Sequence, residues 1–112
     1  MMKKDDTVYR AQILDAIAKV ESFVGHISVD AFKENQEKQS AVILQLIIIG
    51  ELSKHLSDGF KSQYSAPWRQ IAGLRDRAVH DYFSLDVEQL WKTIEEDVPM
   101  LKKVLLTYKI IL

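Results

Sequence analysis

Three residues that could do chemistry, Arg75, His80 and Tyr82, lie at short intervals in one segment of the sequence. An arginine carries a permanent charge and a planar fork of donors that suits phosphate oxygens, and a histidine exchanges a proton near neutral pH. A histidine could move the proton between a ribose 2′-hydroxyl and a departing 5′-oxygen while an arginine stabilises the charge around phosphorus. Together, these residues could cleave a phosphodiester of RNA without a metal.

The spacing predicts how one helix would present these side chains. At about 100° per residue, Arg75 and His80 are roughly 140° apart, whereas Tyr82 returns to within about 20° of Arg75. The structural alternative is that Arg75 and Arg77 are solvated helix charges and that His80 marks a helix end. On residue types alone this alternative is the commoner one, because short arginine and histidine patterns recur widely.

The sequence around the three residues resembles a known family. Residues 67–74 (PWRQIAGL) lead into the motif, and it is followed by Phe83, Leu85-Asp86, Trp91 and Asp97-Val98-Pro99. With Ile49-Gly50-Glu51 upstream, these segments closely resemble the HepT-like group of the HEPN superfamily. Its members are small helical proteins partnered with minimal nucleotidyltransferases (MNT) in prokaryotic toxin–antitoxin pairs. The resemblance runs from about Val8 to Leu105.

The family signature is an arginine, four residues, a histidine, one residue and a tyrosine, and this sequence matches it without a gap. The resemblance implies an endoribonuclease toxin that needs no metal and leaves a 2′,3′-cyclic phosphate, with His80 as the proton-transfer group and Arg75 as the phosphate clamp. It also implies that the partner nucleotidyltransferase, a separate chain, neutralises the toxin by placing AMP on Tyr82. Asp76 stands where the family often has asparagine, which leaves its polar role open.

The resemblance further implies a homodimer whose motif helices face each other across a two-fold cleft, with RNA as the substrate and no cofactor. Asp76, Arg77 and Glu51 are the expected supporting residues. Glu51 and His55 are four residues apart, but no third metal ligand follows, so we expect a helix-surface pair in which Glu51 reaches an arginine of the motif. Two alternatives stay open: a non-catalytic nucleotide-binding or substrate-binding subunit of a nucleotidyltransferase complex, and a helical dimer with a vestigial motif.

Length and charge limit the remaining possibilities. A chain of 112 residues predicts a single domain over 1–112. With 15 basic and 16 acidic side chains the net charge is −1, so any RNA contact must be a local patch. No signal peptide is recognisable, and the apolar run over residues 41–50 is far shorter than the roughly 20 residues of a membrane span. We therefore expect a cytoplasmic protein without membrane contact.

The elements that would position the motif are all helical. We predict an up-and-down all-α bundle of four main helices plus a short helix. The first helix should run from near Asp6 to about Val24 and stop at Gly25, and Ser28 should cap the short helix. A third, highly apolar helix over about 37–56 should be central and also contribute to a subunit interface, with Gly50 marking a close crossing of another helix.

The second half of the chain should hold the motif helix and one more. Gly59 is expected to end the third helix, residues 60–66 to form a loop, and Pro67 to open the motif helix. Asp86 and Gln89 have the spacing of a capping box for the last helix, which Pro99 should kink. At the end of the motif we expect Tyr82 to be exposed and Phe83 to be the core residue of the pair.

Overall fold

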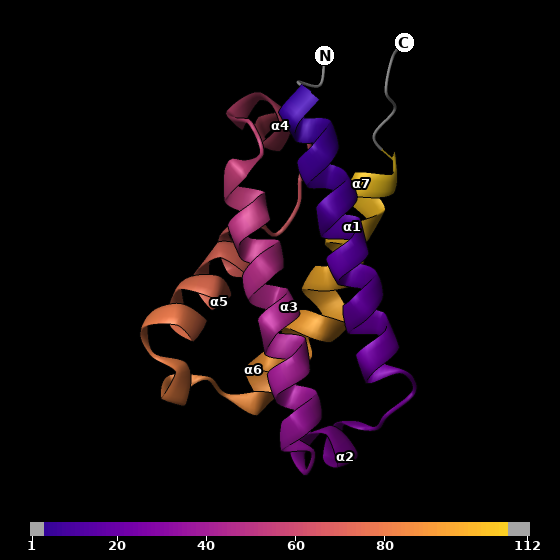
Figure 1. Cartoon of the computed structure of the whole chain (residues 1–112), viewed down its shortest axis with the longest axis vertical. Coiled ribbons are helices and arrows are strands. Elements are labelled where there is room, and N and C mark those ends of the chain that lie inside the picture. The colour runs from indigo at the N-terminus through magenta and orange to yellow at the C-terminus, as the bar shows by residue number, and fades with distance from the viewer. Residues whose placement is uncertain (1–3, 108–112) are drawn as a thin grey trace.

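The computed structural model describes residues 4–107, which form helices and short turns with no strand among them (Figure 1). The predicted all-α bundle is therefore confirmed. The α-helices are α1 (Lys4–Val24), α2 (Val29–Lys33), α3 (Gln36–His55), α4 (Asp58–Gln63), α5 (Trp68–His80), α6 (Val87–Lys92) and α7 (Val98–Thr107). A 3-10 turn, η1 (Tyr82–Ser84), follows α5, and a π-helical turn, η2 (Thr93–Asp97), joins α6 to α7.

Helix α3 is the central element, as its apolar sequence predicted. It packs along most of α1 on one side and along α5 on the other. Figure 1 shows these three helices side by side, with α6 and α7 crossing behind α1 and α3. Because α3 contacts both long neighbours, it needs apolar side chains on more than one face, which accounts for the weak amphipathic pattern of its sequence.

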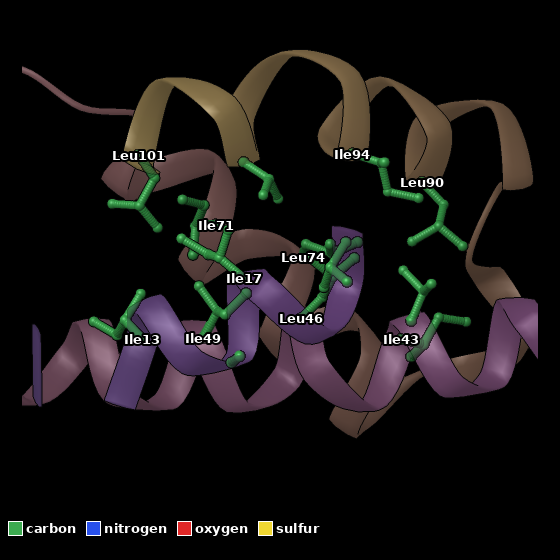
Figure 2. Close-up of a cluster of buried hydrophobic side chains, with 14 of the residues drawn as sticks. Ile13, Ile17, Ile43, Leu46, Ile49, Ile71, Leu74, Leu90, Ile94 and Leu101 are labelled. Carbon is green, nitrogen blue, oxygen red and sulfur yellow. The ribbon is translucent and has the colours of Figure 1, made fainter. Parts of the chain in front are cut away.

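The core lies between α1, α3 and α5 on one side and the C-terminal helices on the other (Figure 2). In Figure 2, Leu101 points down from the C-terminal helices toward Ile17 of α1 and Ile49 of α3, and Leu90 and Ile94 point toward Ile43 of α3. Leu101, Ile17 and Ile49 are fully buried. At about 1.5–3 kcal/mol for each large apolar side chain, this cluster is the main force that holds the C-terminal helices against α1 and α3.

Local signals in the first half of the chain work as predicted. Gly25 has a φ of 56°, the left-handed conformation that ends α1. The hydroxyl of Ser28 accepts a hydrogen bond from the backbone N–H of Ala31 at 3.1 Å and so caps α2. Asn35, which was not predicted as a cap, caps α3 in the same way by accepting a hydrogen bond from the N–H of Lys38 at 2.9 Å.

The prediction of a loop over residues 60–66 is wrong for its first part, which belongs to helix α4. Ser57 starts this helix by accepting a hydrogen bond from the N–H of Phe60 at 3.1 Å, and the Phe60 side chain is buried. The buried carboxylate of Asp6 in turn accepts from the backbone N–H and the hydroxyl of Ser57, at 2.8 and 2.7 Å. Gly59 therefore lies inside α4, and the prediction that it ends the third helix is wrong, since α3 ends at His55.

The capping box predicted for the last helix forms only by half. Asp86 caps α6 by accepting from the N–H of Glu88 at 3.0 Å, but the Gln89 side chain accepts from Arg77 instead of returning to the cap. Pro99 lies in the first turn of α7, directly after η2. Proline cannot donate a backbone hydrogen bond, and a π-helical turn is a recognised cause of helix kinks. The irregularity expected at Pro99 therefore takes the form of the π-helical turn η2 just before it. Within residues 4–107, no helix combines the length and apolar character needed to cross a membrane.

Candidate functional site

Helix α5 passes close to α3 at Gly50, where the sequence predicted a crossing. A methyl group added to Gly50 would collide with Cβ and Cγ of Arg75 and lie 3.2 Å from the carbonyl oxygen of Ile71. Only a residue without a Cβ lets the two helices pass this closely. Gly50 therefore allows the base of the Arg75 side chain to lie against the backbone of α3.

The guanidinium of Arg75 is held by two carboxylates. One terminal nitrogen lies 2.8 Å from Oε2 of Glu51 on α3, and the other donates to Oδ1 of Asp76 at 3.1 Å. The Arg75 side chain is 21% exposed, so the group is partly shielded but still reaches the surface. The expected contact between Glu51 and an arginine of the motif is confirmed, and Arg75 is that arginine.

Asp76 is shared by two cations. Nζ of Lys54 on α3 donates to Oδ1 of Asp76 at 2.8 Å, the same oxygen that accepts from Arg75. The hydrogen bond from Lys54, followed by that from Arg75, holds the pKa of the Asp76 carboxyl below its ordinary value. Asp76 is therefore a bridge between α3 and α5, a role that its position in the motif did not reveal.

A fourth contact extends the cluster to α1. Nε2 of His55 lies 3.6 Å from Oε1 of Glu51, and the imidazole stacks on the ring of Tyr9 with 5.3 Å between ring centres. The helix-surface pair of Glu51 and His55 is thus confirmed. Among the described residues no three His, Cys, Asp or Glu side chains are grouped so that they could hold a metal ion.

The other end of the motif is open to solvent. Helix α5 ends at His80, and Asp81 adopts φ −152° and ψ 65°, after which the chain turns through η1. Exposure reaches 44% for Tyr82 and 98% for Phe83, and His80 is also exposed. Within residues 4–107, His80 makes no hydrogen bond or ion pair through its side chain.

Two expectations for this end of the motif have different outcomes. The exposure of Tyr82 is confirmed, but the placement of Phe83 in the core is wrong, since its ring is almost entirely in solvent. Tyr82 was expected to lie on the same side of the helix as Arg75 if the helix continued. The helix ends at His80, before Asp81, so this condition is not met. Arg75 and His80 lie on the same helix but about 140° apart, so the histidine does not join the carboxylate cluster.

Arg77 lies apart from Arg75. It is exposed and donates to Oε1 of Gln89 on α6 at 3.1 Å. Two residues that contact the cluster, Lys54 and Tyr9, were not anticipated. Lys54 is three residues after Glu51 and is therefore its neighbour on the surface of α3, which is a usable signal. Tyr9 carries no such signal, because its contact depends on how α1 crosses α3.

An all-α bundle with Arg75 and His80 on its motif helix and Tyr82 in the turn that follows is the arrangement expected of the HEPN class. The family model described as "Ribonuclease HepT-like" matches residues 13–107. The chain therefore belongs to the HepT-like ribonuclease family.

Curated relatives agree with this assignment. The chain is 42% identical to "Probable ribonuclease HepT" of Thermococcus cleftensis over 102 residues, which cover 90% of the chain and 93% of that protein. It is 36% identical to "Putative RNase MJ1380" of Methanocaldococcus jannaschii over 104 residues, covering 92% and 95% of the two chains. No solved structure gives a significant match.

Proposed function

We propose that this chain is a metal-independent endoribonuclease and the toxin of a HEPN/MNT toxin–antitoxin pair in the cytoplasm. The match to the HepT-like ribonuclease family across residues 13–107 carries the proposal. The exposure of His80 supports it, since a group that exchanges protons with RNA must be reachable. The partial exposure of Arg75 fits a charge that is held in position and still meets a phosphate.

In the proposed reaction the ribose 2′-oxygen attacks the adjacent phosphorus while His80 takes the proton from the 2′-hydroxyl. The bond from phosphorus to the 5′-oxygen breaks, and the histidine returns the proton to that oxygen. The products are a 2′,3′-cyclic phosphate and a free 5′-hydroxyl. Arg75 stabilises the charge on the phosphoryl oxygens in the transition state.

Regulation is proposed at Tyr82. A partner nucleotidyltransferase transfers AMP from a nucleoside triphosphate to the phenol oxygen, which releases pyrophosphate. The 44% exposure of this side chain supports the proposal, because a docked transferase must reach the oxygen. A phosphodiester at this position adds negative charge and bulk next to His80, and both disfavour RNA binding there.

We further propose that two protomers, each a single domain, form a homodimer with a composite site. The support is that Arg75 and His80 of one helix lie about 140° apart, so one protomer offers its phosphate clamp and its proton-transfer group on different faces. A second copy could place its own histidine opposite an arginine. A dimer mass by light scattering across micromolar concentrations is expected, and a monomer at every concentration would refute this arrangement.

The second candidate function is a non-catalytic nucleotide-binding or substrate-binding subunit of the nucleotidyltransferase complex. One observation favours it: Glu51 and Asp76 hold Arg75 in place, whereas His80 is exposed without such support, as in a site that binds a phosphate without transferring a proton. Such a subunit would bind a nucleotide or RNA without cutting it, whether or not His80 were present.

Cleavage of RNA by the purified protein in EDTA separates the two functions. We expect cyclic-phosphate products from the wild type and a loss of about 10²–10⁴-fold in rate for His80→Ala. His26→Ala is the matched control, because this histidine is exposed in the turn after α1. Equal cleavage by the wild type and His80→Ala would point to a contaminating nuclease and remove the catalytic proposal.

Intact-mass measurement after co-expression with the cognate nucleotidyltransferase tests the regulation. The wild type should gain AMP and lose toxicity, and Tyr82→Phe should gain none and stay toxic. Tyr64→Phe is the control, since Tyr64 is half-buried and packs against Phe60. An adenylate found on another residue would remove Tyr82 from the proposal and leave the nuclease part standing.

A further inference from the structure

Lys54 is a residue of α3 that lies outside the Arg75, His80 and Tyr82 motif, yet it binds a carboxylate within that motif. Its Nζ lies 2.8 Å from Oδ1 of Asp76, closer than the 3.1 Å between that oxygen and Arg75. The lysine side chain is 40% exposed and the aspartate 50%. A single exposed ion pair contributes little to stability. We therefore consider what the positive charge of Lys54 does to the charges around Arg75.

The charges around Arg75 would be unfavourable for a phosphate without Lys54. Glu51 and Asp76 both lie within ion-pair distance of the guanidinium, so these three groups together carry one negative charge. A negative cluster repels a phosphate oxygen that approaches Arg75, and the repulsion is stronger near a low-dielectric surface than in bulk water. Lys54 brings the cluster to neutrality and fixes Asp76 in the position that supports Arg75.

We propose that Lys54 is a positioning residue that keeps Arg75 competent to bind the phosphate of RNA, acting through Asp76 and not by touching the RNA. The inference rests on the proposed function of Arg75 as the phosphate clamp. Removal of Lys54 leaves Asp76 with only Arg75 as a partner, so the carboxylate draws the guanidinium more strongly and competes with the phosphate for it.

The chain offers a closely matched control. Lys102 on α7 binds Glu21 on α1 at 2.8 Å, with side-chain exposures of 39% and 50%. Figure 1 shows α7 and α5 on opposite flanks of the molecule. Lys54→Met and Lys102→Met therefore remove the same charge from equivalent ion pairs, one beside Arg75 and one far from it.

The test is a double-mutant cycle between Lys54 and Asp76, read by fluorescence anisotropy. The probe is a short RNA blocked by 2′-O-methyl groups, so that binding is measured without cleavage. Lys54→Met should weaken binding about tenfold in the wild-type background and less than about twofold in the Asp76→Asn background, because the neutral amide needs no counter-charge. Lys54→Arg should restore binding, and Lys102→Met should change it by less than about twofold.

Two further readouts separate positioning from a purely structural role. In cleavage assays Lys54→Met should raise KM more than it lowers kcat, and it should leave the thermal midpoint nearly unchanged. In carboxyl NMR titrations the pKa of Asp76 should rise toward its ordinary value in Lys54→Met. An unchanged Asp76 pKa, or a Lys54→Met effect of equal size in both backgrounds, would overturn the inference, the latter because it indicates direct contact with RNA. Failure of the wild type to bind the RNA at all would instead overturn the proposed function itself.

Discussion

The two ends of the motif from Arg75 to Tyr82 are built differently. At Arg75 the helix is pressed against α3 at Gly50, and the guanidinium is held by two carboxylates with only 21% of the side chain exposed. Five residues later, at His80, the helix ends in solvent, and the following turn exposes 44% of Tyr82 and 98% of Phe83.

This difference indicates which part of the site is complete within one chain. An arginine fixed by an ion pair and a hydrogen bond has lost much of its rotamer freedom before any ligand arrives, and this preorganisation favours the binding of a charged group. The exposed end has no such support within the described residues. Under the proposed function, it is the part that a substrate, a second protomer or a partner chain would complete.

The largest expected effect separates activity from stability at the two ends. Arg75→Ala and His80→Ala should each reduce RNA cleavage by about 10²–10⁴-fold, since each removes a group that we propose acts in the transition state. Arg75→Ala should also lower the free energy of unfolding by about 1–2 kcal/mol, because it leaves Glu51 with only His55 as a partner; the value is kept small because Glu51 is partly exposed. His80→Ala should change that free energy by less than about 0.5 kcal/mol.

Cleavage rates and urea denaturation measured on the same preparations check this contrast. Equal losses of stability in the two variants would mean that the histidine end is as firmly packed as the arginine end. Such a result would remove the distinction between a preorganised and an open end.

The next largest effect concerns the packing that holds Arg75. Gly50→Ala should destabilise the protein by about 1–3 kcal/mol, because the added methyl group meets the base of the Arg75 side chain and not a flexible tip. Gly73→Ala is the control within α5, where a Cβ would meet nothing within 4 Å. It should stabilise the protein by about 0.5–1 kcal/mol, the ordinary gain of alanine over glycine in a helix. Thermal unfolding of both variants decides the matter, and a neutral Gly50→Ala would disprove the close crossing.

Much of the fold could be predicted because its signals are local. Gly25 ends α1 and Ser28 caps α2 through residues one to three positions away, and the period of apolar residues identified the main helices. The missed helix α4 depends on Ser57, which the sequence alone presents as an ordinary polar residue. Its cap is fixed by Asp6, 51 residues earlier in the chain, and no local pattern contains that contact.

The site shows the same limit. The contact of Glu51 with a motif arginine and the crossing at Gly50 were predicted, since both follow from helix packing against helix. The failed half of the capping box has a tertiary cause, because Arg77 engages Gln89 from another helix. The burial of Phe83 was predicted from its hydrophobicity alone, whereas the break at Asp81 and the tighter turn of η1 decide where its ring points.

The smallest expected effect is at Phe83, and it is informative because an aromatic ring normally contributes strongly to a core. Phe83→Ser should alter the free energy of unfolding by less than about 0.5 kcal/mol, since 98% of the residue is already in water. Phe32→Ala, on a phenylalanine that is fully buried, should cost about 3–5 kcal/mol as the reference. The comparison is best made by denaturation at low and at high protein concentration. If the cost of Phe83→Ser grew with concentration, the ring would be buried against a second copy, and the open end of α5 would be a protomer contact as well as a site.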